Sequence, residues 1–268
     1  SCRLYMKNIN NFLHFPLADA GLSPTYWQAS TFPEPFKSKI KVIHDGIDTN
    51  LVKPLDDLKI VLDQSVKISN KDEIITFINR NLEPYRGYHI FMRSLPYLLK
   101  KRPNSRILIV GGDQVSYGAK SKSGQSWKQI FINEIRSQLS DLEWERIHFL
   151  GSVSYQKFLS ILQISSVHVY LTYPFVLSWS LLEAMSAGCA IVASDTQPVR
   201  EAIIDFETGL LVDFFNYKEL AEKINLLLED VKLRKRLSMN ARRFAIENYD
   251  LRSICLPQQL KWLLDLAH

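Results

Sequence analysis

The feature that most restricts the fold of this chain is a series of short, uninterrupted apolar runs separated by segments of helical spacing. Strands that are apolar throughout are typical of a parallel sheet covered by helices on both faces. The pattern therefore predicts an α/β fold, a doubly wound, Rossmann-like parallel sheet of about six strands. Apolar runs lie at 40–43, 74–78, 106–110, 147–150, 167–171, 190–193 and 209–212, and helices are expected at 88–101, 127–139, 154–164, 180–187, 198–203, 218–228, 232–247 and 254–266.

Composition excludes several other classes of protein. The 268 residues are 46% hydrophobic, which is enough to bury a full core in one large or two small domains. No apolar run approaches the roughly 20 residues that span a bilayer. The three cysteines are scattered, which favours a reducing cytoplasm over a disulfide framework. The net charge of +5 fits phosphate-bearing ligands or peripheral contact with an anionic membrane, and it fits an ordinary basic surface equally well.

In a doubly wound sheet, ligands bind beyond the carboxyl ends of the strands, so the loops that follow the strands are the first places to search. The loop after 74–78 carries Arg80 and Arg86 around a Pro-containing turn. Two guanidinium groups beside a helix start would suit a diphosphate. The alternative is a pair of exposed arginines, one of them paired with Glu83.

Two further loops carry glycines. Gly111, Gly112 and Asp113 follow one strand, and Gly151 and Val153 follow the next. Glycine lets a ligand approach the backbone, and exposed backbone at these loops could contact a nucleotide base. Ordinary tight turns explain the glycines as well, and Ser154 can be a plain helix cap.

Glu183 has two interpretations. Ser180 and Glu183 have the spacing of a capping box at a helix start. Alternatively, the two carboxylate oxygens accept hydrogen bonds from the vicinal hydroxyls of a ribose. The two roles are compatible.

Missing motifs narrow the chemistry. The chain has no Gly-x-Gly-x-x-Gly, no P-loop and no Asp-x-Asp. A bound diphosphate would therefore be neutralised by arginines and a helix N-terminus, with no metal and no cofactor. His148 and His168 lie inside apolar runs, so we expect core histidines there.

From about residue 39 to 247 the chain resembles the C-terminal, donor-binding domain of a GT-B glycosyltransferase of retaining family 4. The resemblance rests on several segments in the family's order, which are individually weak and jointly specific: "KVIHDGIDT", "FINRNLEPYRGYHIF", "ILIVGGD", "IHFLGSVSYQKFLSILQISSVHVYL", "SWSLLEAMSAGCAIVASDTQPVREAI" and "TGLLV".

The resemblance implies specific roles. Arg80 and Arg86 would bind the donor diphosphate, and Glu183 would bind the ribose. Phe175, Val176, Leu177 and Ser178 would present backbone amides to the sugar and phosphates. Transfer would be metal-independent and would retain the anomeric configuration.

Position 175 departs from the family pattern. The family usually has glutamate eight residues before the position of Glu183, and here that residue is Phe175. This marks either a distinct subgroup, which we favour, or a weakened transferase. No catalytic residue is identified in this chain.

The resemblance also implies a division of the chain. Residues 1–38 would be the tail of a missing N-terminal acceptor domain, 39–250 the nucleotide-sugar-binding domain, and 251–268 a helix that packs back toward the acceptor domain. The expected function is the donor half of a glycosyltransferase that uses UDP-hexose, such as UDP-glucose, and makes polysaccharide or glycolipid on a carbohydrate or lipid-linked acceptor. Alone it should bind donor and transfer little. The alternatives are a non-catalytic nucleotide-sugar-binding module and a UDP-sugar epimerase of similar fold.

Overall fold

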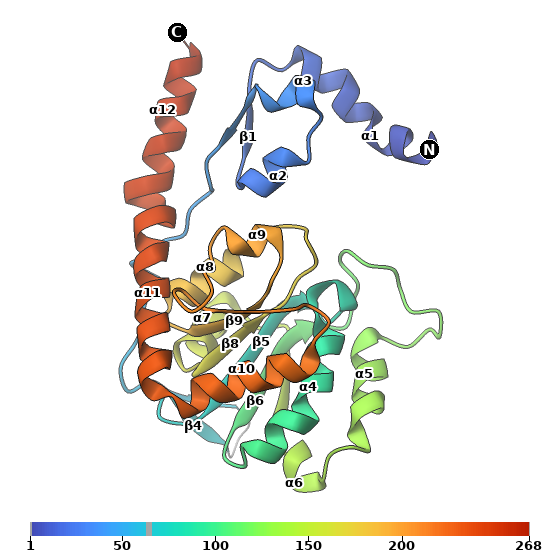
Figure 1. Cartoon of the computed structure of the whole chain (residues 1–268), viewed down its shortest axis with the longest axis vertical. Coiled ribbons are helices and arrows are strands. Elements are labelled where there is room, and N and C mark those ends of the chain that lie inside the picture. Colours follow the sequence, from blue (N-terminus) through green and yellow to red (C-terminus); the bar gives the residue numbers. More distant parts are fainter. Residues whose placement is uncertain (1, 63–65, 268) are drawn as a thin grey trace.

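The computed structural model describes residues 2–62 and 66–267. A large unit built on a central sheet lies next to a small N-terminal unit (Figure 1). The helices α11 (Val231–Tyr249) and α12 (Leu256–Ala267), joined by a π-helical turn at Leu251–Cys255, form a column beside both units (Figure 1). Among the described residues, no helix is both long and apolar enough to cross a membrane.

The central sheet confirms the predicted fold class. It has six strands in the order β10-β9-β8-β5-β6-β7, and every neighbouring pair is parallel. The strands are β5 (Ile74–Asn81), β6 (Arg106–Gly112), β7 (Ile147–Gly151), β8 (Val167–Tyr170), β9 (Ala190–Ser194) and β10 (Leu210–Val212).

The order of these strands creates a switch point. The chain runs outward in one direction from β5 through β6 to β7, and in the other from β8 through β9 to β10. Strands β5 and β8 are neighbours, so the loops that leave them diverge at the same edge of the sheet. A crevice between two such loops is where ligands bind in doubly wound sheets.

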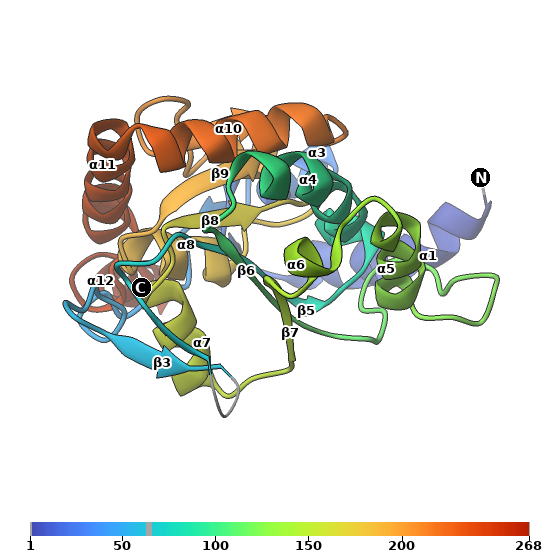
Figure 2. The ribbon, with the colours of Figure 1, turned by 90° about the horizontal axis from the view of Figure 1, so that it is seen from below.

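Alternate residues of each strand enter two hydrophobic cores. Ile75 and Phe77 face one core, while Ile74 and Ile78 face the other, as the two-residue period of a strand requires. Figure 2 shows α4 and α10 on one side of the sheet and α7 on the other. The first core includes α4 (Tyr88–Lys101), α5 (Trp127–Arg136) and α10 (Tyr217–Glu229), and the second includes α7 (Tyr155–Gln163), α8 (Trp179–Ser186) and α11.

The first of the expected strands lies outside this sheet. Strand β2 (Ile40–Val42) pairs in parallel with β1 (Gly21–Ser23) in a separate two-stranded sheet. This pairing places β2 with the small N-terminal unit. The unit also contains α1 (Cys2–His14), the 3₁₀ turn Phe15–Leu17, α2 (Tyr26–Ser30) and α3 (Glu34–Lys37).

Other short elements escaped sequence prediction. The expected polar linker before β5 contains a hairpin of β3 (Lys59–Val61) and β4 (Lys67–Ser69), and α6 (Asp141–Trp144) precedes β7. Elements of three or four residues are too short to show a hydrophobic period. The helix α9 (Gln197–Arg200) is also shorter than expected. Its neighbour Glu201 accepts hydrogen bonds from the backbone N–H groups of Tyr26 and Trp27, at 2.9 and 2.7 Å, which links the two units.

Candidate functional site

A cavity of about 720 Å³ opens at the switch point. Its walls come from the loops that follow β5, β6 and β7 and from the start of α8. Arg80, Arg86, Val153, Ser178 and Glu183, all predicted site residues, line it together. The complete lining is Ile78, Asn79, Arg80, Arg86, Val110, Tyr117, Ser152, Val153, Tyr155, Phe158, Ser178, Trp179, Ser180 and Glu183.

Arg86 is a buried cation, with only 7% of its surface exposed. It ends the 3₁₀ turn Pro84–Arg86, and Gly87 follows with a positive φ of 70°. An added Cβ at Gly87 would come 2.3 Å from Cβ of Leu171, so only glycine lets the loops after β5 and β8 approach this closely. The guanidinium Nη1 of Arg86 donates to Oγ1 of Thr172 at 3.0 Å.

No carboxylate among the described residues forms an ion pair with Arg86. Its guanidinium carbon instead lies 4.9 Å from the ring centre of Tyr117 and 5.6 Å from that of Phe175. A buried charge without a counter-charge is costly. The side chain is therefore suited to receive an anion in the cavity.

The alternative role suggested for Glu83, pairing with one of the arginines, is wrong. Glu83 is fully buried, and its carboxylate accepts hydrogen bonds from the backbone N–H groups of Ser116, Tyr117 and Gly118 at 3.1, 3.3 and 3.0 Å. It holds the loop after β6 in place. Arg80, at the end of β5, is exposed and lines the cavity.

Glu183 is not part of a capping box. The helix α8 begins one residue earlier than expected, at Trp179, so Ser178 occupies the N-cap position and Glu183 lies too far along the helix to reach back. Oε1 of Glu183 instead accepts a hydrogen bond of 2.7 Å from the Tyr155 hydroxyl. The Ser180 hydroxyl pairs with that of Ser178 at 2.9 Å.

The start of α8 and the Glu183 carboxyl are both available to a ligand. Among the described side chains, none caps the N-terminus of α8, so backbone N–H groups and the positive end of the helix dipole face the cavity. Burial raises the pKa of Glu183, which the bond from Tyr155 partly opposes. Burial, then the hydrogen bond to Glu183, raises the pKa of Tyr155.

The segment expected to present backbone amides only partly lines the cavity. Ser178 does, but its N–H donates to the Tyr170 hydroxyl at 3.2 Å. Leu177 is buried in the core, and Val176 accepts a bond from Tyr170 through its carbonyl. Phe175 contacts Tyr117, with ring centres 4.8 Å apart. Ligand contacts by the amides of 175–177 stay a prediction.

The glycine-containing loops are less involved than their neighbours. Gly111, Gly112 and Gly151 lie outside the cavity lining, while Val110, Ser152 and Val153 belong to it. An added Cβ at Gly112 would approach Oδ1 of Asn81 to 2.7 Å, so chain packing already requires this glycine. Asp113 pairs with Lys128 at 3.3 Å. Ser154 caps α7 through the N–H of Lys157, as the alternative interpretation predicted.

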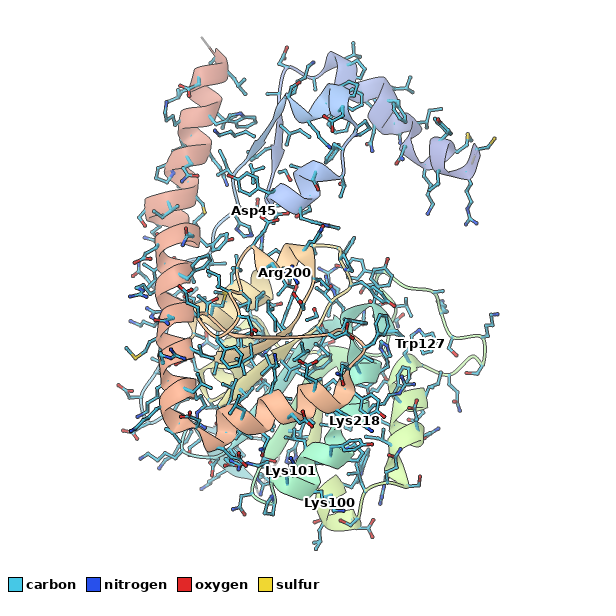
Figure 3. The ribbon with its side chains drawn as sticks, in the orientation of Figure 1. Asp45, Lys100, Lys101, Trp127, Arg200 and Lys218 are labelled. Atoms are coloured by element: carbon cyan, nitrogen blue, oxygen red, sulfur yellow. The ribbon has the colours of Figure 1, made fainter. Side chains whose placement is uncertain are left out.

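Sequence reasoning missed several lining residues. Tyr117 lies in a long loop without a recognisable pattern, so no sequence signal marks it. Tyr155 and Trp179 could have been found, since each occupies the first turn of a helix that follows a strand of the sheet. Nε1 of Trp179 donates to Asp45 at 3.1 Å, and Asp45 lies at the junction of the two units (Figure 3).

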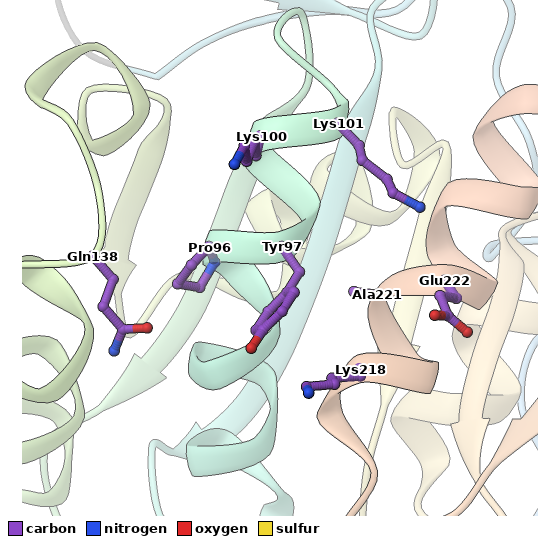
Figure 4. Close-up of a pocket in the computed structure, with 8 residues that line it drawn as sticks. All are labelled: Pro96, Tyr97, Lys100, Lys101, Gln138, Lys218, Ala221 and Glu222. Atoms are coloured by element: carbon purple, nitrogen blue, oxygen red, sulfur yellow. The ribbon is translucent and has the colours of Figure 1, made fainter.

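A second cavity, of about 740 Å³, lies between α4 and α10 at the lower part of the large unit (Figures 3 and 4). Lys100 and Lys101 stand in the last turn of α4, where cations interact favourably with the helix dipole. Figure 4 shows these two side chains pointing to opposite sides of the helix. Because they do not converge on one point, this cavity is the weaker candidate.

Comparison with known proteins gives two family matches. The model of the family "Glycosyl transferases group 1" matches residues 60–244, and that of "Glycosyl transferase family 4 group" matches residues 1–52. An uncharacterized glycosyltransferase, MJ1069 of Methanocaldococcus jannaschii, is 28% identical over 213 residues, which are 79% of this chain and 49% of that protein. A phosphatidyl-myo-inositol mannosyltransferase of Mycolicibacterium smegmatis is 32% identical over 165 residues, 60% of this chain and 37% of that protein. The chain thus spans about half the length, or less, of these relatives.

A solved structure shares the fold. The crystal structure of Anabaena Alr3699/HepE in complex with UDP-glucose aligns with a TM-score of 0.72 at 20% identity, covering 94% of this chain and 65% of that one.

Proposed function

Because this chain belongs to the glycosyl transferases group 1 family, we propose that it binds the nucleotide-sugar donor of a retaining, metal-independent glycosyltransferase. The donor in this proposal is a UDP-hexose such as UDP-glucose. One observation carries it: the buried Arg86, which no carboxylate among the described residues neutralises, lines one cavity with Arg80 and Glu183. UDP-glucose in the Anabaena protein, which shares the fold, supports the choice of donor.

In this proposal each group has a separate task. Arg86, held in place by its neighbours, and Arg80, exposed at the rim, bind the diphosphate beside the start of α8. Glu183 accepts hydrogen bonds from the ribose hydroxyls. During transfer the bond between the anomeric carbon and the β-phosphate oxygen breaks, while the acceptor oxygen bonds to that carbon and loses its proton. The arginines stabilise the negative charge that develops on the departing UDP.

The acceptor would be a carbohydrate or a lipid-linked sugar, and the product a polysaccharide or glycolipid. Since the chain spans about half the length of its relatives, these are proposals for the whole protein. A non-catalytic donor-binding module is the second candidate, and Phe175 favours it because no carboxylate stands where the family places one. Assays of the full-length protein with UDP-sugars separate the two. Membership in the transferase family argues against an epimerase.

Calorimetric titration with UDP, GDP and ADP, in buffer containing EDTA, tests the proposed function. We expect UDP to bind without metal, and Arg80→Ala to weaken it by about ten- to hundredfold, the loss of one charge-assisted hydrogen bond of about 1.5–3 kcal/mol. Lys101→Ala is the matched control, because it removes an exposed cation from the other cavity. Failure of all three nucleotides to bind would refute the proposal, and binding only with added metal would refute metal independence.

A further inference from the structure

The position that departs from the family pattern contacts the buried arginine. Phe175 and Tyr117 have ring centres 4.8 Å apart, and both face Arg86, at 5.6 and 4.9 Å from its guanidinium carbon. We call Phe175 and Tyr117 the aromatic wall. A guanidinium within about 6 Å of a ring centre is attracted to the ring, more strongly when it is desolvated.

The aromatic wall is itself held in place. The three hydrogen bonds that Glu83 accepts fix the backbone that carries Tyr117. Tyr85 meets Phe175 edge-on, with ring centres 6.1 Å apart, and the loops after β5 and β8 are joined by the hydrogen bond from Arg86 to Thr172. The guanidinium of Arg86 therefore has a defined position before any ligand arrives.

A carboxylate at position 175 would act on Arg86 in the opposite way. It would lie beside the guanidinium, pair with it and occupy N–H groups that an incoming anion needs. It would also add a negative charge next to a diphosphate. An aromatic ring attracts the cation through its face and accepts none of the guanidinium N–H bonds in their plane.

We infer that the aromatic wall positions Arg86 and keeps its N–H donors free for the diphosphate of the donor nucleotide, so that Phe175 is a positioning residue and not a sign of decay. This inference rests on the proposed function, because it assumes that a nucleoside diphosphate occupies the cavity. It goes further by assigning the recognition of the diphosphate to aromatic side chains that bind no ligand atom by hydrogen bonds.

The test compares a ligand that has the diphosphate with one that lacks it. UDP affinity is measured by calorimetry and uridine affinity by ligand-observed NMR, without metal, for the wild-type chain and variants at position 175. We expect Phe175→Leu to weaken UDP by about three- to tenfold and to leave uridine within about twofold of wild type. Phe175→Tyr should restore UDP affinity, because it restores the ring.

Phe175→Glu should weaken UDP by about ten- to hundredfold, since an ion pair with Arg86 must be broken for the diphosphate to bind. The matched control is Tyr97→Leu. Tyr97 is another exposed ring under a cation, with Nζ of Lys218 at 5.7 Å from its centre, and it lies in the second cavity. This control should bind UDP like the wild type.

Several outcomes would overturn the inference. Equal losses for UDP and uridine, or no recovery with Phe175→Tyr, would mean that the ring only supports local structure. Stronger UDP binding by Phe175→Glu would mean that the site accommodates the family's acid. If Phe175→Leu does not fold, Tyr117→Leu, at a side chain that is 41% exposed, serves as the second variant. Wild-type binding with no effect of either variant removes the wall alone, whereas no binding of UDP, GDP or ADP to the wild type removes the proposed function and the inference with it.

Discussion

Replacing Glu183 with glutamine separates a ligand-binding role from a structural one. Glutamine has nearly the same shape and keeps an oxygen that can accept the bond from Tyr155, which is 2.7 Å long in the wild type. It removes the negative charge and one of the two acceptor oxygens. If Glu183 binds the ribose, nucleotide affinity must fall, while packing around α8 should be preserved.

The size of the loss follows from the bonds exchanged. A hydrogen bond to a charged group contributes about 1.5–3 kcal/mol and a neutral one about 0.5–1.5 kcal/mol. The difference of about 1–1.5 kcal/mol corresponds to a UDP affinity about five- to tenfold weaker. Glu183→Ala, which removes the acceptor altogether, should weaken UDP by about ten- to hundredfold.

The pH dependence adds an independent sign. Burial raises the pKa of Glu183 above its ordinary value of 4.5, so the folded protein holds this proton more tightly than the unfolded chain. The stabilisation from Glu183 is therefore fully present below the unfolded pKa and is lost as pH rises through the folded pKa. At pH 7 the ionised carboxylate is a burden on the fold, and Glu183→Gln should unfold at the same temperature or higher.

Affinity should respond to pH in the opposite direction. Only the ionised carboxyl accepts from both ribose hydroxyls, so the advantage of wild type over Glu183→Gln should shrink as pH falls through the raised pKa. Calorimetry at several pH values, with thermal unfolding of each variant, measures both effects. Glu222→Gln, in the second cavity, is the matched control. Wild-type UDP affinity in Glu183→Gln, or an affinity loss that merely follows lower stability, would refute the ribose assignment.

Gly87→Ala should lower the free energy of unfolding in urea by about 2–4 kcal/mol, because it combines left-handed backbone strain with a clash against Leu171; Gly124→Ala, with positive φ but open space around it, should cost only about 1–2 kcal/mol, and equal costs would show that the clash relaxes. Glu83→Gln should speed amide hydrogen exchange in the loop after β6, because that carboxylate holds three of its N–H groups; unchanged exchange would contradict this. Stability should fall as pH drops from 6.5 toward 4, since burial lowers the pKa of His89 to about 4 and the unfolded chain then binds a proton that the folded chain excludes. His89→Gln should flatten that slope in urea titrations, and identical slopes would exclude His89 as its source.

Local patterns predicted most of the large elements. The helix expected at 88–101 is α4, because its apolar spacing places Ile90, Phe91, Leu95 and Leu98 on one buried face. Arg80, Arg86 and Glu183 were predicted from their places after strands and line one cavity. Such predictions succeed where the signal lies within a few residues of chain, as it does for helical period and for strand ends.

The errors have a common origin in contacts between distant parts of the chain. The capping box at Ser180 was wrong because the helix starts at Trp179, and Tyr155, 28 residues before Glu183, takes up the carboxylate instead. Glu83 binds backbone groups more than 30 residues further along the chain. No local spacing reports contacts of this kind.

By itself, the sequence determined the α/β class, the succession of strands and helices, and the presence of two arginines and one acid in loops that follow strands. These properties depend on periods and turns that operate over a few residues. Only the tertiary structure decided that β5 lies between β6 and β8, that the loops carrying Arg86 and Glu183 therefore meet, and that Tyr117 and Phe175 face the same guanidinium. The physical reason is that strand order and side-chain burial result from the packing of the whole chain into two cores, which no single segment encodes.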